Sequence, residues 1–316
     1  MNAEQFINEL SEKVIKAIEN GCNPWRKPWK GGVGIPYNGL TERLYTGTNA
    51  LSLAFTDYDD PRFYTLNQVA KFGAVEGNGN IVSMSFLATL KDEDGVPKLD
   101  KHGKVRKYWG RRYIEVYNHE QIKFKDPSQN QKLKVNKREI GNEKKFVEQW
   151  ANKCGIVLQE GPQASYNALT HRVTLPKCEN FITPEGYIST AAHEFSHWTG
   201  KDSVTGRHTK QAKQQMRHKQ KYAIEELVAE ISSSTLVSEL NIWTPEEEEN
   251  SVSYLRGWIK AFKDDPKILG PACGWANTAY AWLRERFPNV EVKELKIKND
   301  IKPAGEMDLF DMINAL

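Results

Sequence analysis

Two histidines and a glutamate in one short run could bind a metal ion and carry out acid–base chemistry with it. Residues 183–200 read TPEGYISTAAHEFSHWTG and contain the pattern HExxH, which places His193 and His197 one helical turn apart. Their imidazoles therefore point the same way and can donate to one Zn²⁺. Glu194 is turned toward a water at that metal and can accept its proton. A solvated histidine pair on a surface helix has the same spacing, so the pattern needs a third ligand.

A third ligand is available in the helix expected over residues 221–236. Glu226 and Glu230 stack one turn apart there, on a face other than the apolar stripe. Glu226 can complete a three-ligand site with an open fourth position, and Glu230 can accept the N–H of a ligand histidine. Glu225, about 100° round the helix, is the competing ligand, and His171 is a further alternative. A solvated acidic face is the other interpretation of these glutamates.

The histidine pair lies in a segment with clear helix boundaries. Thr183 can cap the first turn, Pro184 suits the first helical position, and Gly200 is expected to close the helix. Apolar residues recur at helical spacing and form a stripe that can be buried: Ile188, Ala191, Ala192, Phe195 and Thr199. The sequence therefore predicts that this helix packs on a core and holds both imidazoles on a neighbouring face.

Composition fits a folded chain of two domains. The 316 residues are 39% hydrophobic and carry a net charge of only +3, so net charge alone indicates no partner. Four separated cysteines without a CxxC pair favour reduced thiols and a cytoplasmic location in a bacterial cell. Because no signal peptide or long apolar run is found, we expect neither secretion nor a membrane partner.

Basic and aromatic residues are interleaved in the first half of the chain. Residues 98–138 hold 13 Lys and Arg against four Asp and Glu, and residues 23–32 read NPWRKPWKGG. Aromatic rings stack on unpaired bases while cations follow phosphates, so this pattern suits single-stranded DNA. Buried rings beside solvated lysines are the competing interpretation. The predicted DNA-binding residues are Trp25, Arg26, Lys27, Trp29, Lys30, Arg106, Lys107, Tyr108, Trp109, Arg111 and Arg112.

The first half is expected to be an α+β domain. An amphipathic helix is predicted over residues 4–20, followed by two short helices, of which the second is capped by Thr65 and ends at Gly73. Strands are predicted over residues 80–90 and 111–117. In the second strand one face packs, and the other can present Tyr113 and Tyr117 beside the basic residues.

The second half is expected to be mostly helical with a small sheet. A helix near residues 143–153 and strands over 156–159 and 171–175 precede the histidine helix, and the last strand can offer its edge to an extended substrate. Residues 251–287 are expected to be helical and are rich in aromatic residues. We expect these aromatic side chains, Tyr254 among them, to fill a core. The predicted division is an α+β domain (1–123), a basic linker (124–141), a mostly helical domain (142–299) and an acidic, apolar tail (300–316).

The tail contains a candidate docking motif. Residues 306–310 read EMDLF, which resembles the pentapeptide with which bacterial proteins grip the replicative sliding clamp. Packing of this segment back on the body of the protein is the competing interpretation.

Several long motifs in fixed order resemble the ArdC family of antirestriction proteins. They include IPYNGLTERLYTGTN, FYTLNQVAKFGA, GPQASYN, YISTAAHEFSHWTG and YAIEELVAE. The resemblance implies an N-terminal single-stranded DNA-binding domain, a zincin-like metallopeptidase domain and an origin on a plasmid or phage. It also implies His193, His197 and Glu226 as ligands of one Zn²⁺ and Glu194 as the catalytic carboxylate, with aromatic-basic segments touching DNA.

Two classes of function are consistent with these observations. The first is an enzyme of gluzincin type that binds single-stranded DNA and cleaves some protein, for example a restriction subunit. The second is a non-catalytic DNA-coating protein whose zinc site is structural or idle. An open fourth position beside Glu194 favours the first class. His208 and His218 are candidates to stabilise the transition state, and the sequence does not choose between them.

Overall fold

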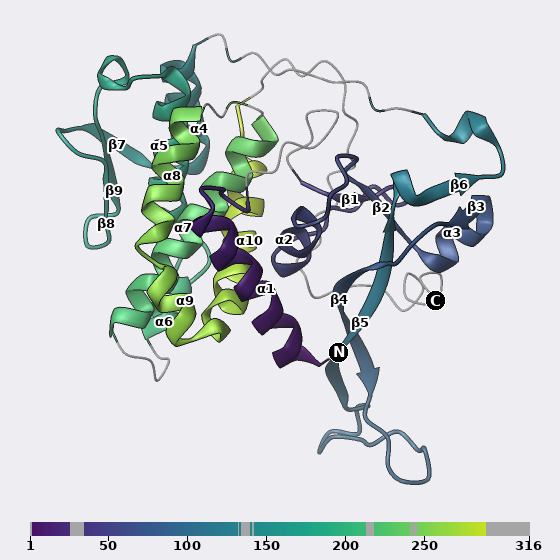
Figure 1. The fold of residues 1–316 in the computed structure, drawn as a ribbon. Helices are drawn as coiled ribbons and strands as arrows, with labels where there is room; N and C mark the ends of the chain where they lie inside the picture. The colour runs from purple at the N-terminus through teal and green to yellow at the C-terminus, as the bar shows by residue number, and fades with distance from the viewer. Residues whose placement is uncertain are drawn as a thin grey trace.

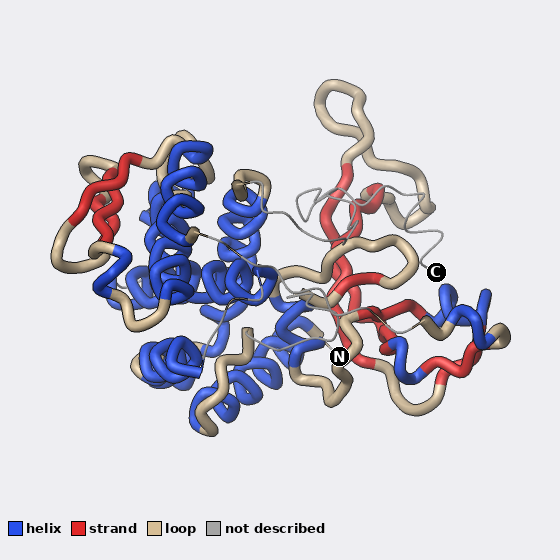
Figure 2. Tube along the Cα trace, turned by 90° about the horizontal axis from the view of Figure 1, so that it is seen from above, coloured by secondary structure: helices blue, strands red, loops and turns tan. Residues whose placement is uncertain are grey.

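The computed structural model describes residues 2–25, 35–131, 133, 140, 142–212, 218–240, 242 and 245–288. A helical body and a smaller sheet-containing part lie side by side, as Figures 1 and 2 show from two directions. The predicted α+β class with two unlike halves is confirmed. Among the described residues, no helix combines the length and apolar character needed to cross a bilayer.

A four-stranded sheet forms the framework of the first half. Its strand order is β1 (Tyr37–Asn38), β2 (Arg62–Thr65), β5 (Lys107–Asn118) and β4 (Asn80–Thr89). β5 pairs antiparallel with β4 along the whole length of β4, and the two strands project away from the remainder of the protein in Figure 1. Helix α2 (Thr48–Ala54) lies on β4, where Asn49 donates to the Ser83 carbonyl and accepts from its N–H, both at 2.7 Å.

The predicted second short helix, α3 (Leu66–Phe72), begins as expected at Thr65, whose hydroxyl caps it. It ends at Gly73, as predicted, and the extended Gly73 also starts strand β3 (Gly73–Val75). β3 pairs with β6 (Ile122–Phe124), so ordered structure continues into the segment predicted to be a linker.

The tyrosines predicted to face outward from β5 pack inward. Tyr117 is buried and donates to Glu115 at 2.7 Å. Tyr113 lies against Phe6 with ring centroids 5.1 Å apart, and its hydroxyl oxygen is buried. The expectation of an open tyrosine face is therefore wrong, because both rings fill the space between the sheet and neighbouring elements.

The second half is built on helices that pack around α5 and α7. They are α4 (Glu143–Cys154), α5 (Pro184–Trp198), α6 (Arg207–Ala212), α7 (His218–Leu240), α8 (Pro245–Arg256), α9 (Ile259–Asp264) and α10 (Leu269–Arg284). One core cluster includes Trp150, Phe195 and Leu236, so α5 is held between α4 and α7.

The small sheet has the order β7 (Val157–Glu160), β9 (Arg172–Leu175) and β8 (Ser165–Asn167). β9 is the central strand and is paired on both sides. The strand predicted over 171–175 therefore has no free edge, and the prediction that it receives a substrate is wrong. β8 is the edge strand that packs against α5.

The first helix belongs to the core of the second half. α1 (Ala3–Glu19) contributes Phe6, Leu10, Val14 and Ile18 to a cluster with α7 and α10. This packing cuts across the predicted division at residues 1–123, although the linker and the boundaries at 142–299 remain a prediction.

Candidate metal centre

Helix α5 holds the two histidines of the HExxH pattern. Thr183 caps it by accepting the Gly186 N–H at 3.2 Å, and its apolar stripe is buried as predicted. His193 and His197 project from the adjacent face with ring centroids 4.9 Å apart. The helix ends at Trp198 with Thr199 as its C-cap residue, and Gly200, which follows, is not in a left-handed conformation. Glycine is needed there for space, since a Cβ would collide with the ring of His208.

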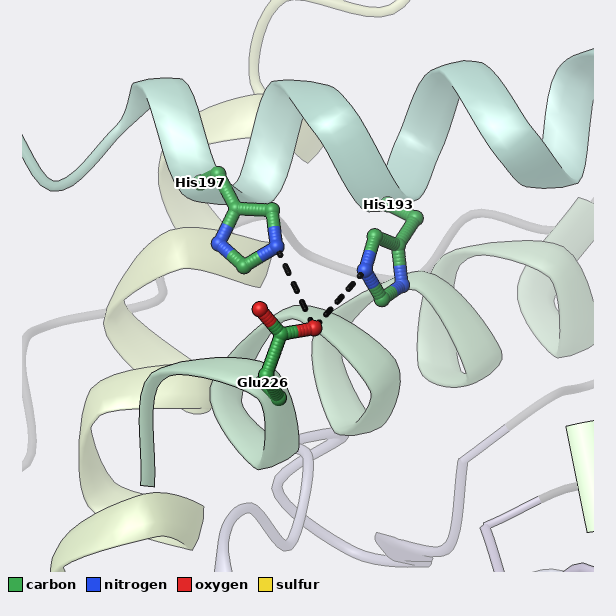
Figure 3. Close-up of side chains that lie close together, drawn as sticks. All are labelled: His193, His197 and Glu226. Carbon is green, nitrogen blue, oxygen red and sulfur yellow. Dashed lines mark ion pairs between the residues drawn. The ribbon is translucent and has the colours of Figure 1, made fainter. Parts of the chain in front are cut away.

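Glu226 on α7 meets the two histidines. Oε2 of Glu226 lies 3.8 Å from Nε2 of His193 and 3.8 Å from Nε2 of His197, as Figure 3 shows. One donor atom from each residue falls within 4.8 Å of the others. A divalent ion about 2.0–2.2 Å from two imidazole nitrogens and a carboxylate oxygen fits such a space. The structure thus brings together the three predicted ligands.

Small residues let the two ligand helices approach. Ala223 and Ala229 of α7 are buried. Ser196 of α5 and Ser232 of α7 place their hydroxyl oxygens 3.0 Å apart. Bulkier side chains at Ser196 and Ser232 would separate the two helices and carry Glu226 away from the imidazoles.

Glu230 lies behind His193, in the position that its spacing predicted. Its Oε2 is 3.4 Å from His193 Nδ1, on the side of the ring opposite Glu226. The Glu230 carboxylate also accepts hydrogen bonds from the hydroxyls of Ser234 (3.2 Å) and Ser251. A carboxylate on Nδ1 keeps the proton there and directs the Nε2 lone pair to the ion.

Glu225, the competing ligand, lies behind His197. Its Oε1 is 3.1 Å from His197 Nδ1 and 3.2 Å from His208 Nε2. Arg207, only 1% exposed, grips the same carboxylate at 2.7 and 2.9 Å. Burial by itself raises the pKa of Glu225, but the Arg207 charge and the histidine hydrogen bonds hold it well below its usual range. Glu225 therefore orients a ligand and lies outside the three convergent donors.

Glu194 is buried beside the three donors, with 9% exposure. Burial raises the pKa of its carboxyl group, while the charges of His193 and His197 and a hydrogen bond from the Tyr166 backbone N–H act in the opposite direction. The pKa of Glu226 falls to about 2: burial raises it, but His193, His197 and Tyr254 outweigh that effect. The two carboxylates thus have different environments, which raise the pKa of Glu194 and lower that of Glu226.

Two tyrosines border the site from α7 and α8. The Tyr254 hydroxyl donates to Glu226 Oε2, and its ring lies 5.8 Å from that of His193. Tyr222 and Tyr254 both contact Trp258. Tyr254 is 38% exposed, so the prediction that it fills a core is wrong. Burial and the neighbouring carboxylate raise the pKa of its phenol, which keeps the proton available for donation.

The alternative ligand His171 lies elsewhere, and His218 is a candidate for transition-state stabilisation, not for metal binding. His171 occupies a left-handed turn with φ 53° and contacts the Tyr166 hydroxyl at 2.7 Å through Nδ1. The side chain of His218 is outside the described residues. Arg207, Tyr254 and the serines around Glu230 were not identified from the sequence.

The predicted DNA-binding residues have different surroundings. Trp25 is 8% exposed and packs in the core with α7 and α10, so its ring has no open face for a base and that prediction is contradicted. Residues 26–34, with Arg26, Lys27, Trp29 and Lys30, lie outside the described residues. On β5 and just before it, several predicted residues are exposed: Arg106, Lys107, Tyr108 and Arg111.

Arg112 and Trp109 complete the predicted set on β5. Arg112 is half-buried, with its guanidinium 5.9 Å from the Phe86 ring centroid. The backbone of Trp109 pairs with Leu87. Since side chains alternate along a strand, Lys107 and Arg111 lie on one face of the ribbon and Tyr108 and Arg112 on the other.

Both halves of the chain match known families. Residues 143–273 match a zincin-like metallopeptidase family. Residues 4–147 match the N-terminal domain of the anti-restriction factor ArdC. Fold and site thus define a two-part protein with a zincin-like metallopeptidase domain and a site suited to a divalent metal.

Solved structures agree with this class. The metal-free crystal structure of the antirestriction ArdC protein from plasmid R388 matches with a TM-score of 0.68 at 26% identity, covering 90% of this chain and 99% of that one. The Mn(II)-bound structure of that protein matches with a TM-score of 0.65 at 24% identity, covering 90% and 98%. The chain is ArdC-like in both halves, and the resemblance to the ArdC family is confirmed.

Curated relatives include two proteins from Escherichia coli named DNA primase TraC. One is 29% identical over 320 residues, covering 95% of this chain and 29% of the relative. The other is 30% identical over 281 residues, covering 83% of this chain and 18% of the relative. The chain therefore spans less than a third of the length of either relative.

Proposed function

We propose that the chain is an antirestriction protein that binds single-stranded DNA and carries a zinc-dependent peptidase site. The convergence of His193, His197 and Glu226 beside a buried Glu194 carries the peptidase part. Both histidines keep part of their side chains exposed, at 19% and 12%, so solvent and a substrate can reach the centre.

Each side chain has a defined task in peptide hydrolysis. A divalent ion held by the three donors supplies a Lewis acid that polarises a carbonyl and acidifies water. Glu194 takes the proton from the attacking water and passes it to the departing amine. Burial raises the pKa of Glu194 above its usual value, which makes its carboxylate a better proton acceptor for this task.

Tyr254 is our candidate for the residue that stabilises the developing oxyanion. Its hydroxyl already lies at Glu226, at the edge of the donor group, and its proton is retained. A hydroxyl donor aimed at this charge lowers the barrier. His208 is a weaker candidate, because its Nε2 contacts Glu225.

The edge strand β8 is our candidate to align the substrate backbone. It packs against α5, and its Tyr166 N–H bonds to Glu194. A peptide that adds to β8 by main-chain hydrogen bonds would pass the metal ligands. We propose a protein substrate, for example a subunit of a restriction system.

The exposed basic ribbon supports the DNA part of the proposal. Arg106, Lys107 and Arg111 can follow phosphates, and Tyr108, 48% exposed, can stack on an unpaired base. The match of residues 4–147 to the N-terminal domain of the anti-restriction factor ArdC also supports a DNA partner for this half. Such activities place the protein in the cytoplasm of a bacterial cell, where restriction acts. The proposed clamp motif at residues 306–310 lies outside the described residues.

A Glu194→Gln variant separates the enzyme from a DNA-coating protein with an idle site. Its matched control is Glu148→Gln, an exposed change on α4 in the same half. We expect both to bind zinc, but only Glu148→Gln to protect unmodified plasmid DNA in a restriction-proficient host. Full protection by Glu194→Gln would reject the peptidase account of antirestriction in favour of DNA coating.

Metal analysis tests the cofactor. We expect one zinc per purified chain and none after substitution of His193, as three protein ligands with an N,N,O donor set favour Zn²⁺. Stoichiometric manganese in place of zinc would overturn the choice of ion while keeping the site.

A further inference from the structure

A buried polar cluster connects the N-terminal segment to the metal centre. Asn23 is 4% exposed and lies against Ser234 of α7 and Ser251 of α8. Both serines are buried and contact Glu230, the carboxylate behind His193. Polar groups removed from water in this way need partners with the correct donor and acceptor character.

The orientation of the Asn23 amide follows from its neighbours. Its Oδ1 lies 2.9 Å from the backbone nitrogen of Trp25, which can only donate. The opposite atom is therefore Nδ2, a donor, which lies 2.7 Å from Ser251 Oγ and 3.0 Å from Ser234 Oγ. A flipped amide would place N–H against N–H at Trp25, so the assignment is fixed by chemistry.

This orientation sets the direction of the remaining hydrogen bonds. Both serine oxygens accept from Asn23, and both hydroxyls donate to Oε1 of Glu230. Oε1 then accepts two bonds and is held on the serine side. The other oxygen, Oε2, faces Nδ1 of His193 at 3.4 Å.

Asn23 is itself firmly held. The adjacent Trp25 ring is buried among residues of α7 and α10, and the Trp25 carbonyl accepts from Ser238 of α7 at 3.3 Å. The amide thus has a fixed place from which to orient the two serines.

We propose that Asn23 is a positioning residue for the metal centre. Through Ser234 and Ser251 it orients Glu230, which keeps the proton on Nδ1 of His193 and Nε2 free for the ion. The inference rests on the proposed metal centre. It assigns a role in metal binding to a residue more than 200 positions away from Ser234 and Ser251 in the chain.

The test compares zinc affinity of the full chain by competition with a chromophoric chelator. Asn23→Leu keeps the approximate volume and removes the donors, and we expect zinc to bind 10–100-fold more weakly, as for other lost outer partners of metal ligands. The visible spectrum of the Co²⁺-loaded protein should change as well. The control is Glu148→Gln, an exposed change on α4 outside this polar cluster, and its affinity should stay within about 3-fold of the parent.

A merely structural role for Asn23 predicts a different result. Asn23→Leu would then lower the melting temperature but leave both zinc affinity and the Co²⁺ spectrum of the folded protein unchanged, which would overturn the inference. If Asn23→Leu does not fold, the Ser234→Ala, Ser251→Ala double variant decides by the same two readouts. A parent chain that binds no zinc would reject the proposed metal centre itself, which separates the two failures.

Discussion

The metal centre and the β4–β5 ribbon are both rich in charged residues, but they hold them differently. At the metal centre the charges are buried and matched: Arg207 is 1% exposed and grips Glu225, which in turn holds His197. On the ribbon, Lys107 and Arg111 are exposed to solvent. Charged residues that are fixed by buried partners can orient ligands, whereas exposed ones have to find their counter-charge in another molecule.

The largest effect on stability is expected from breaking the buried ion pair between Arg207 and Glu225. Arg207→Met removes the cation paired with the Glu225 carboxylate, so we expect about 3–5 kcal/mol loss in the free energy of unfolding. Urea unfolding of the metal-free protein measures this change. The double variant Arg207→Met, Glu225→Gln should recover much of the loss. An Arg207→Met protein as stable as the parent would show that this ion pair does not stabilise the fold around the site.

Removing a ligand should abolish the metal site with less damage to the fold. We expect Glu226→Gln to bind zinc more than about 100-fold more weakly, since losing an outer partner alone costs 10–100-fold. Equilibrium dialysis against zinc measures this affinity. Glu148→Gln serves as the control, and equal zinc binding by both variants would remove Glu226 from the ligand set.

Tyr254→Phe tests the proposed oxyanion donor. Loss of such a donor costs about 10²-fold in kcat, and we expect this loss in cleavage of a generic protein substrate, with zinc content unchanged. Tyr222→Phe is the matched control, because Tyr222 lies beside the same carboxylate and contacts the same Trp258. Equal rates for parent and Tyr254→Phe would exclude the role.

DNA binding by the β4–β5 ribbon should depend on salt concentration. Replacing Arg106, Lys107 and Arg111 by Gln should lower the slope of log affinity against log salt for single-stranded DNA by about 2, since each phosphate contact contributes about 0.7. Three exposed lysines of the helical half, Lys13, Lys144 and Lys260, provide the control substitutions. An unchanged slope would place the DNA elsewhere.

The smallest effect concerns the one histidine buried in the sheet half. Burial and the Arg62 charge lower the pKa of His119. The unfolded chain therefore binds the proton more readily, and the stability that neutral His119 contributes is present above pH of about 6.5 and lost as the pH falls below it. His119→Asn should flatten the dependence of the urea midpoint on pH between about 5 and 7. An equally steep dependence in the variant would assign the proton to another group.

The predicted parts of the site were those encoded by local periodicity. His193 and His197 share a face because they lie one turn apart, and helical spacing places Glu226 and Glu230 together on another face than the apolar stripe, with Glu225 as the competing ligand. Arg207 and Asn23 could not be predicted in this way. Arg207 reads as one more basic residue in a loop, and Asn23 meets Ser251 across 228 positions of the chain.

Aromatic residues gave the least reliable predictions of which side chains are exposed. A tryptophan beside basic residues suits either stacking on bases or packing in a core, because a flat apolar ring serves both. Trp25 and Tyr117 pack inward, while Tyr108 is exposed. Whether a given ring is buried depends on tertiary packing, which the local sequence does not specify.

The packing of α1 has a consequence for how this protein can be divided. Phe6, Leu10 and Val14 share a core cluster with Ile224, Leu227 and Leu269, which belong to the half that carries the candidate metal ligands. A fragment that begins at residue 142 would expose to water the apolar side chains of α7 and α10 that α1 covers, and it would lack Asn23. Recombination that exchanged the sheet half between relatives would yield a working hybrid only if residues 2–25 travelled with the helical half.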